Sequence, residues 1–134
     1  MDKNEIIRKV MDSESTKVKI AIADIDGILR GKYINKKKFL DSVDNNIGIC
    51  DVVFGWDAGD VCYGSSKITG WHTGYPDAKA TLDLSTFREI PWEGNTPFFL
   101  ADFSLDSAYE KASCSRSLLK RIAKDCEETG YLPR

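Results

Sequence analysis

The chain has 134 residues, of which 42% are hydrophobic and 30% are charged, and its formal net charge is −2. This length is near that of a common single domain, and the composition is typical of a globular protein. The small negative charge disfavours nucleic acid as a partner, because nucleic-acid binders usually carry a strong basic excess or a basic stripe.

Hydropathy and cysteine usage favour an intracellular protein. No apolar run approaches the ~20 residues of a membrane-spanning helix, and the charged N-terminus lacks the apolar core of a signal peptide. We therefore expect a cytoplasmic location and no membrane partner. Free thiols are expected in that reducing compartment. No metal site is predicted, because the cysteines lack zinc-site spacing; they are Cys50, Cys62, Cys114 and Cys126.

The first half of the chain begins with a predicted helix over residues 4–11, which have amphipathic spacing. Residues 18–23 are β-branched and nearly all apolar, which predicts a strand buried on both faces. Asp26-Gly27 then predicts a two-residue hairpin turn. The returning strand, to about residue 34, carries Arg30, Gly31 and Lys32.

Further along, Asn35 is a suitable N-cap for a helix over residues 36–43, so Lys36-Lys37-Lys38 is interpreted as its solvated first turn. Residues 47–56 are predicted to form a strand. Residues 57–77 hold four glycines and three large rings without periodicity, and a loop of this length is usually functional or mobile. The rings are Trp71, His72 and Tyr75.

The second half predicts three strands, over residues 80–85, 87–92 and 98–103, and a helix over residues 116–128. Ser113 or Ser115 is expected to cap this helix, and Gly130 to end it. Its apolar face consists of Leu118, Leu119, Ile122 and Cys126. The whole pattern of five or six strands and three helices indicates an α+β fold, with one sheet and the helices mainly on one of its faces.

Carboxylates are the richest chemical class in the sequence. Asp24 and Asp26 have the same parity on the hairpin, which allows their side chains to share a face, but we interpret Asp26 as a turn former and Asp24 as the end of the strand. Asp57 opens the glycine-rich loop, where a carboxylate can hold a cation or accept a proton. From spacing alone, Asp57 is also a candidate loop-capping residue. Nucleotide binding by this chain alone is rejected, because a phosphate-binding loop ends in Gly-Lys-Ser/Thr, whereas Gly31-Lys32 is followed by Tyr33.

Three segments, in this order, resemble the N-terminal domain of the glutamine synthetase family: residues 23–32 (Ala-Asp-Ile-Asp-Gly-Ile-Leu-Arg-Gly-Lys), residues 53–57 (Val-Phe-Gly-Trp-Asp) and residues 83–86 (Asp-Leu-Ser-Thr). The helix beginning near Arg116 fits the family segment that precedes its catalytic domain. The hairpin pattern is most similar to the branch of γ-glutamylputrescine synthetases and other glutamine-synthetase-like ligases.

The resemblance implies a β-grasp fold and an ATP-dependent ligase that joins glutamate to ammonia or an amine. It also implies that this domain completes the active site of the adjacent subunit in a homo-oligomeric ring. Asp57 takes the position that binds and deprotonates the ammonium or amine, and Asp60 competes for that role. Further residues implied by the resemblance are an interface and family motif of Asp24, Gly27, Arg30, Gly31 and Lys32, and loop contacts of Ser65, Ser66 and Trp71.

The resemblance also sets an expected domain division: residues 1–16 as helix and linker, 17–112 as the β-grasp domain, and 113–134 as a helix leading toward a catalytic domain. The resemblance implies ATP and Mg²⁺ or Mn²⁺ for the full-length parent. We expect no cofactor in this chain, and we predict that the chain alone is inactive. The alternative is a stand-alone β-grasp module without catalysis, whose aromatic loop binds a protein or a small molecule.

Overall fold

The computed structural model describes residues 1–103 and 113–133. The chain forms two compact units. The first, which we name the sheet unit, consists of Met1–Ile22, Leu29–Ile49 and Asp77–Ser104. The second, the loop unit, consists of Ala23–Ile28, Cys50–Pro76 and Leu105–Arg134. Within the last of these segments, the structure describes residues 113–133.

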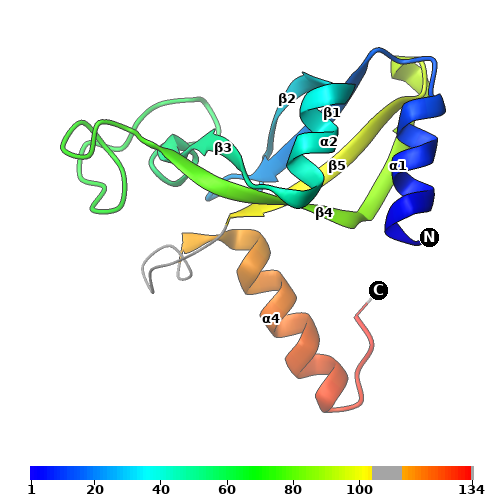
Figure 1. Ribbon diagram of the computed structural model, residues 1–134. Helices are drawn as coiled ribbons and strands as arrows, with labels where there is room; N and C mark the ends of the chain where they lie inside the picture. Colours follow the sequence, from blue (N-terminus) through cyan, green and yellow to red (C-terminus); the bar gives the residue numbers. More distant parts are fainter. Residues whose placement is uncertain (104–112, 134) are drawn as a thin grey trace. The chain divides into compact units, whose positions relative to one another are not determined.

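A five-stranded sheet in the order β2-β1-β5-β4-β3 organises the sheet unit (Figure 1). β1 pairs in parallel with β5, whereas β4 pairs antiparallel with β5, so the sheet is mixed. This confirms the predicted α+β class and its β-grasp-like sheet. The strands are β1 (Lys17–Ala23), β2 (Leu29–Asn35), β3 (Ile47–Cys50), β4 (Asp77–Ile90) and β5 (Thr96–Phe103).

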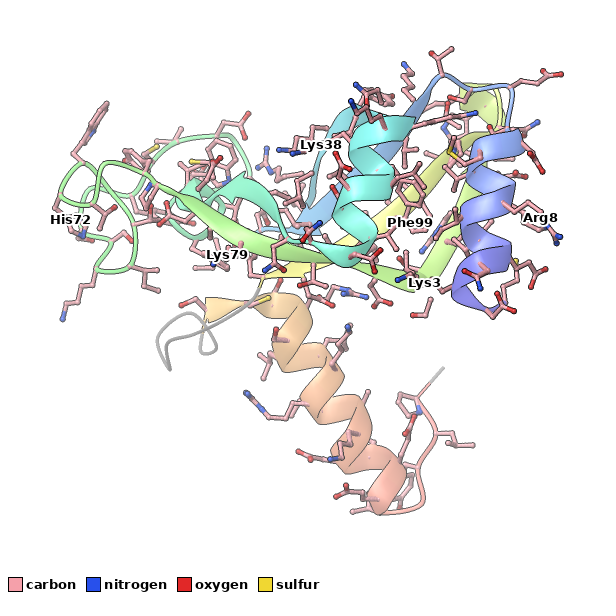
Figure 2. All side chains as sticks on the ribbon, viewed as in Figure 1. Lys3, Arg8, Lys38, His72, Lys79 and Phe99 are labelled. Atoms are coloured by element: carbon pink, nitrogen blue, oxygen red, sulfur yellow. The ribbon has the colours of Figure 1, made fainter. Side chains whose placement is uncertain are left out.

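Helices α1 (Lys3–Asp12) and α2 (Lys36–Asp44) lie on the same face of this sheet (Figure 1). Alternate residues of β1 supply the core beneath them, as strand geometry requires. The ring of Phe39 from α2 stacks on that of Phe99 from β5, with centroids 5.1 Å apart. Figure 2 shows Phe99 within this layer. Both predicted helices are confirmed, and Asn35 caps α2 by accepting the N–H of Lys38.

The β1–β2 hairpin turn is longer than predicted. The N–H of Gly27 donates to the carbonyl of Asp24, and the N–H of Asp24 donates to the carbonyl of Ile28. Three residues therefore form the connection, with Gly27 left-handed at φ +81° while Asp26 keeps a negative φ. The two-residue prediction was wrong because the favoured two-residue turns need a positive φ at their first central position, which Asp26 does not adopt.

The predicted strands 80–85 and 87–92 are one strand, β4, with an irregularity between Asp83 and Arg88. Here the Thr86 hydroxyl accepts the N–H of Leu100 at 2.8 Å, and Thr86 also donates to the carbonyl of Asp83. The hydroxyl thus takes over the role of a ladder carbonyl, so the strand continues across a β-bulge. The predicted division into two strands is therefore an irregularity within one strand.

The strand predicted over residues 47–56 ends early. β3 stops at Cys50, and a short 3₁₀ helix, η1 (Asp51–Phe54), follows. Val53 and Phe54 are both buried, so their apolar character reflects a buried turn. A run of adjacent buried residues does not distinguish a strand from a helix by periodicity. A second 3₁₀ helix, η2 (Pro91–Glu93), ends β4.

Helix α4 (Ser115–Glu128) in the loop unit confirms the last predicted helix, and its apolar face is not buried in the described part of the chain. Leu119 is 67% exposed, and no residue of α4 is buried. The spacing of apolar residues along α4 shows which of them share a face, but it does not show whether another element covers that face. Cys114 is its N-cap residue without a side-chain cap. Gly130 ends the helix as predicted, with φ +88°.

Lys36 ties the two helices of the sheet unit together. Its ammonium donates to the carbonyls of Met11 and Ser13, at 2.9 and 2.6 Å, and so caps the C-terminal end of α1. A cation at this end of a helix is favourable. We expect Lys36→Met to lower the free energy of unfolding by about 1 kcal/mol in denaturant titrations. Lys37→Met is the matched control and should have little effect; equal losses would contradict the capping role.

Candidate functional site

The loop of the loop unit, residues 50–76, is fixed at both ends. The N–H of Asp51 donates to the carbonyl of Pro76, and the buried Asp51 carboxylate accepts the hydroxyl of Thr69. Gly55 lies against Thr69, where an added Cβ would come within 2.6 Å of the Thr69 methyl group. These contacts hold the long glycine-rich segment that follows η1 in a defined path.

Asp57 closes a small turn inside this loop. One carboxylate oxygen, Oδ1, accepts the N–H groups of Gly59 and Val61, at 2.8 and 3.0 Å. The main chain of Asp57 also bonds with that of Val61, next to an isolated bridge between Trp56 and Cys62. Asp57 is therefore the loop-capping residue that its position indicated, and the same bonds fix the direction of its carboxylate.

Asp60, the competing candidate, lies at the exposed tip of this turn and has a left-handed backbone with φ +65°. Its N–H donates to the carbonyl of Asp57. The structure therefore places the two aspartates in one turn but in different settings: Asp57 is half-buried and anchored, and Asp60 is exposed. The catalytic assignment of either residue stays a prediction.

Tyr63 of the loop unit is influenced by the charges of three aspartates. Partial burial raises the pKa of the Tyr63 phenol, and the charges of Asp26, Asp57 and Asp24 raise it further, in that order. Charges from the hairpin turn and from the glycine-rich loop thus act on one hydroxyl. Sequence reasoning missed Tyr63, because no local pattern links it to a turn some 40 residues earlier in the chain. The candidate site consists of Tyr63 and these three aspartates.

Asp24 is fully buried and organises the turn next to this cluster. Its carboxylate accepts the N–H groups of Asp26 and Ile28, at 3.0 and 2.8 Å, and its carbonyl accepts the hydroxyl of Ser115. The neighbouring Ile25 donates its N–H to the carbonyl of Val53. Hydrogen bonds within the loop unit thus join the hairpin turn to η1 and to the start of α4.

The cationic segment of the hairpin lies in the sheet unit. The Lys32 ammonium donates to the carbonyl of Gly48 at 2.7 Å, so a side chain of one edge strand reaches the other edge strand of the sheet. Gly31 packs against the backbone of Ile20, and Arg30 is half-buried. The predicted interface role of these residues stays a prediction.

The remaining predicted loop contacts, Ser65, Ser66 and Trp71, come after Asp57 and Asp60 in the sequence. Ser65 is exposed, and the Ser66 hydroxyl accepts the N–H of Thr69. Trp71 is 90% exposed and meets the ring of Tyr75 edge-on, with centroids 5.4 Å apart. A hydrogen bond with Cys62 is the largest cause of the raised pKa of Tyr75, and burial is the second. His72 lies in the same loop (Figure 2).

All four cysteines are free thiols, which confirms that expectation. Cys114 is buried, whereas Cys50 and Cys126 are only partly buried. In the part of the chain that the structure describes, no helix is long and apolar enough to cross a membrane.

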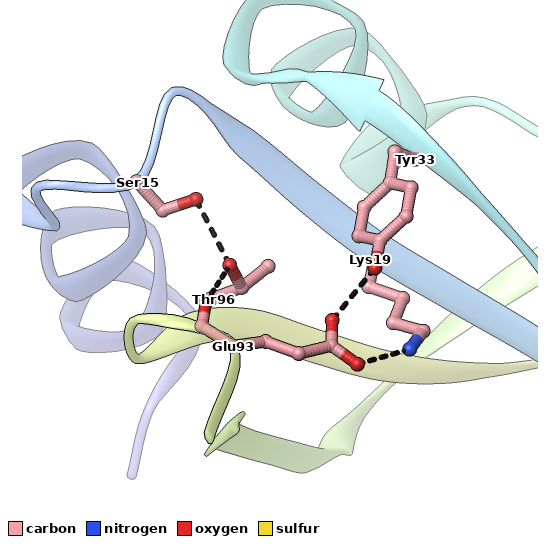
Figure 3. Close-up of polar contacts among 5 residues, drawn as sticks. All are labelled: Ser15, Lys19, Tyr33, Glu93 and Thr96. Atoms are coloured by element: carbon pink, nitrogen blue, oxygen red, sulfur yellow. Dashed lines mark hydrogen bonds and ion pairs between the residues drawn. The ribbon is translucent and has the colours of Figure 1, made fainter. Parts of the chain in front are cut away.

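Figure 3 shows a charged cluster in the sheet unit that sequence reasoning missed. Glu93 accepts the ammonium of Lys19 at 2.6 Å and the hydroxyl of Tyr33 at 2.7 Å. The hydrogen bond from Lys19, and then that from Tyr33, lowers the pKa of Glu93, while the bond to Glu93 raises the pKa of Lys19. These residues are far apart in sequence and meet only through β1, β2 and η2.

Because the pKa of Glu93 is lowered on folding, its stabilising contribution is present above the unfolded pKa, near 4.5, and is lost as pH falls through the folded value. We expect Glu93→Gln to be less stable than the wild type at pH 7, with a difference that shrinks on acidification below about pH 5. Urea titrations from pH 3 to pH 7 measure this. Glu127→Gln should leave the profile unchanged, and a pH-independent difference for Glu93→Gln would exclude the charge effect.

Comparison with solved structures defines the class of domain. The fold matches the structure titled "CryoEM Plasmodium falciparum glutamine synthetase", with a TM-score of 0.65 and 16% identity over 97% of this chain and 23% of that one. It also matches the structure titled "GmaS/ADP complex-Conformation 1", with a TM-score of 0.64 and 16% identity over 92% of this chain and 26% of that one. The fold is therefore that of the N-terminal domain of a glutamine-synthetase-type protein.

Sequence relatives supply the family. The chain is 50% identical over 128 residues to "Type-1 glutamine synthetase 2" of Dictyostelium discoideum, covering 96% of this chain and 25% of that protein. It is 32% identical over 115 residues to "Glutamate--isopropylamine ligase" of a Pseudomonas species, covering 85% of this chain and 25% of that protein. No family model matches the chain. The chain belongs to the glutamine synthetase family, and it spans about a quarter of the length of these relatives.

Proposed function

We propose that this chain is the N-terminal domain of a glutamine-synthetase-like, ATP-dependent carboxylate–amine ligase. It supplies the Asp57 carboxylate to the active site of the adjacent subunit, where glutamate is joined to ammonia or an amine. The observation that carries the proposal is the Asp57 carboxylate, which the N–H groups of Gly59 and Val61 hold in the glycine-rich loop at 2.8 and 3.0 Å. The names of the relatives support the reaction class, since they include an isopropylamine ligase and a γ-glutamylethanolamide synthetase.

The geometry suits a cationic amine. An ammonium group beside the Asp57 carboxylate is stabilised in its charged form, which favours its arrival. Asp57 is held by two backbone N–H groups through one oxygen, so its carboxylate keeps a fixed direction. A carboxylate fixed beside the bound cation can then take a proton from the nitrogen as that nitrogen attacks the acyl carbon.

ATP and the divalent cation are assigned to the remainder of the proposed ligase. Among residues 1–103 and 113–133, no three His, Cys, Asp or Glu side chains are arranged to hold a metal ion. We propose that these residues hold neither the metal nor the nucleotide by themselves. Their proposed contribution is to hold the incoming cation and its proton, in a homo-oligomeric assembly in which subunits share active sites.

The coding sequence beyond Arg134 is the first test. Continuation into a region of about 300 residues with alternating strands and helices supports the ligase, whereas a stop codon at that point favours the stand-alone binding module. The 134-residue chain itself is expected not to release phosphate from ATP in the presence of glutamate and an amine. Glutamate- and amine-dependent phosphate release by the purified chain would contradict the division of labour proposed here.

A further inference from the structure

The segment around Asp57 folds back on itself as a short antiparallel ladder. The N–H of Asp57 donates to the carbonyl of Val61 at 3.0 Å, and the N–H of Tyr63 donates to the carbonyl of Gly55 at 2.7 Å. Side chains alternate between the two faces of such a ladder, and directly opposed residues share a face. Asp57 and Val61 are opposed and therefore share a face, and Tyr63 joins them because it lies two residues beyond Val61. We name this side of the ladder the Asp57 face.

The neighbours of the carboxylate on the Asp57 face are apolar. Val61 stands directly across the ladder from it, and Tyr63 is its diagonal neighbour, which an aromatic side chain can reach. The fourth position on this face is Gly55, where an added Cβ would come within 2.6 Å of the buried Thr69 methyl group. That methyl group therefore occupies the place of the missing side chain opposite Tyr63. One carboxylate thus lies beside three groups that offer carbon contacts.

The electrostatics of Tyr63 agree with this arrangement. Burial, followed by the charges of Asp26, Asp57 and Asp24, raises the pKa of the Tyr63 phenol. The phenol therefore keeps its proton at neutral pH, so Tyr63 offers an aromatic ring and a neutral hydroxyl and does not act as a base. Under the proposed function, the proton of the amine goes to Asp57, and Tyr63 is left with a contact role.

We propose that Val61 and Tyr63 are specificity-determining residues, which hold the carbon body of the incoming amine while Asp57 holds its nitrogen. This inference rests on the function proposed above. A primary alkylamine fits the Asp57 face, with its ammonium group on the carboxylate and its first carbons against the Val61 methyl groups and the Tyr63 ring. Ammonia has no carbon to make these contacts, whereas each methylene that an amine buries is worth about fourfold in affinity. The inferred substrate class is therefore a primary amine with an apolar chain.

The test measures kcat/KM of the full-length ligase for ammonia, methylamine and propylamine, with glutamate and ATP saturating. The wild type should prefer propylamine to methylamine by roughly tenfold, since the two amines are protonated alike and differ by two methylenes. Tyr63→Ser should lower this propylamine-to-methylamine ratio at least threefold, whereas Tyr63→Phe should keep it. Val61→Thr, which exchanges a methyl group for a hydroxyl, should lower the ratio at least twofold. Cys62→Ser is the matched control, because Cys62 pairs with Trp56 and so lies on the opposite face of the ladder.

The outcomes distinguish this inference from the proposed function. Wild-type turnover of Asp57→Asn with every amine would reject the proposed function and this inference with it. Lost turnover in Asp57→Asn, combined with an unchanged ratio in Tyr63→Ser and Val61→Thr, would overturn the inference alone. A wild type that uses ammonia better than propylamine, or an equal fall of the ratio in Cys62→Ser, would also overturn it. Isotope exchange in the glutamate phosphorylation step shows which variants are folded, and Val61→Thr decides the outcome if Tyr63→Ser is not.

Discussion

Replacing Gly31 by alanine is expected to lower the free energy of unfolding by about 2–3 kcal/mol. A Cβ at this position would lie 2.7 Å from the carbonyl oxygen of Ile20 and 3.3 Å from the Cβ of Ala21. The first contact is with backbone in a paired strand, so a rotamer change cannot relieve it. β2 must move away from β1, and the hydrogen bonds between these two strands lengthen.

Thermal and urea unfolding measure this prediction, and the midpoint should fall by roughly 8–12 °C. Gly64→Ala is the control, because no atom lies within 4 Å of the Cβ that it would add. Hydrogen exchange of the β1 and β2 amides should locate the loss in the hairpin. An alanine variant as stable as the Gly64 control would show that the two strands can separate at little cost.

Signals confined to a few neighbouring residues predicted the structure well. Asn35 caps α2 through the N–H of Lys38, and Gly130 ends α4 in a left-handed conformation. Both effects act within one helical turn, so the sequence alone contains the necessary information. The continuous apolar run of β1 is of the same kind, since it predicted burial on both faces and Ile20, Ala21 and Ile22 are all buried.

Tertiary contacts decided the elements that were predicted wrongly. Ser85-Thr86 has the composition of a loop, but the Thr86 hydroxyl bonds with Leu100 of the neighbouring strand and keeps β4 continuous. Likewise, the hydrogen bond from Asp51 to Pro76 joins residues 25 positions apart as η1 begins, where an apolar run predicted a strand. Such partners are visible only after the chain has folded.

The candidate site shows the same limit. The position of Asp57 at the start of a glycine-rich loop indicated a capping residue, and its bonds to Gly59 and Val61 confirm that role. The shared effect of Asp57 and the hairpin aspartates on the pKa of Tyr63 had no local signal, because these residues belong to two distant segments. A structural and a functional role are compatible here, since anchoring one oxygen directs the whole carboxylate.

Asp57→Asn separates these two roles in the full-length ligase proposed above. The asparagine side-chain oxygen can still accept the N–H groups of Gly59 and Val61, so the turn should persist. The negative charge and the ability to take a proton are lost. We expect amine-dependent turnover to fall by about 10²–10³-fold, within the range typical of general acid–base groups. Phosphorylation of the glutamate carboxylate should change far less, because it precedes attack by the amine.

Two further variants complete this experiment. Asp57→Ala removes both the charge and the turn anchor, so it should lose at least as much turnover as Asp57→Asn and should also make residues 58–61 more accessible to protease. Asp60→Asn tests the competing carboxylate and is expected to retain most activity. Stopped-flow measurement of amine-dependent product formation, beside isotope exchange for the phosphorylation step, distinguishes the stages. Wild-type turnover in Asp57→Asn combined with a large loss in Asp57→Ala would leave Asp57 as a turn anchor alone. A large loss in Asp60→Asn would move the proton-accepting role to Asp60.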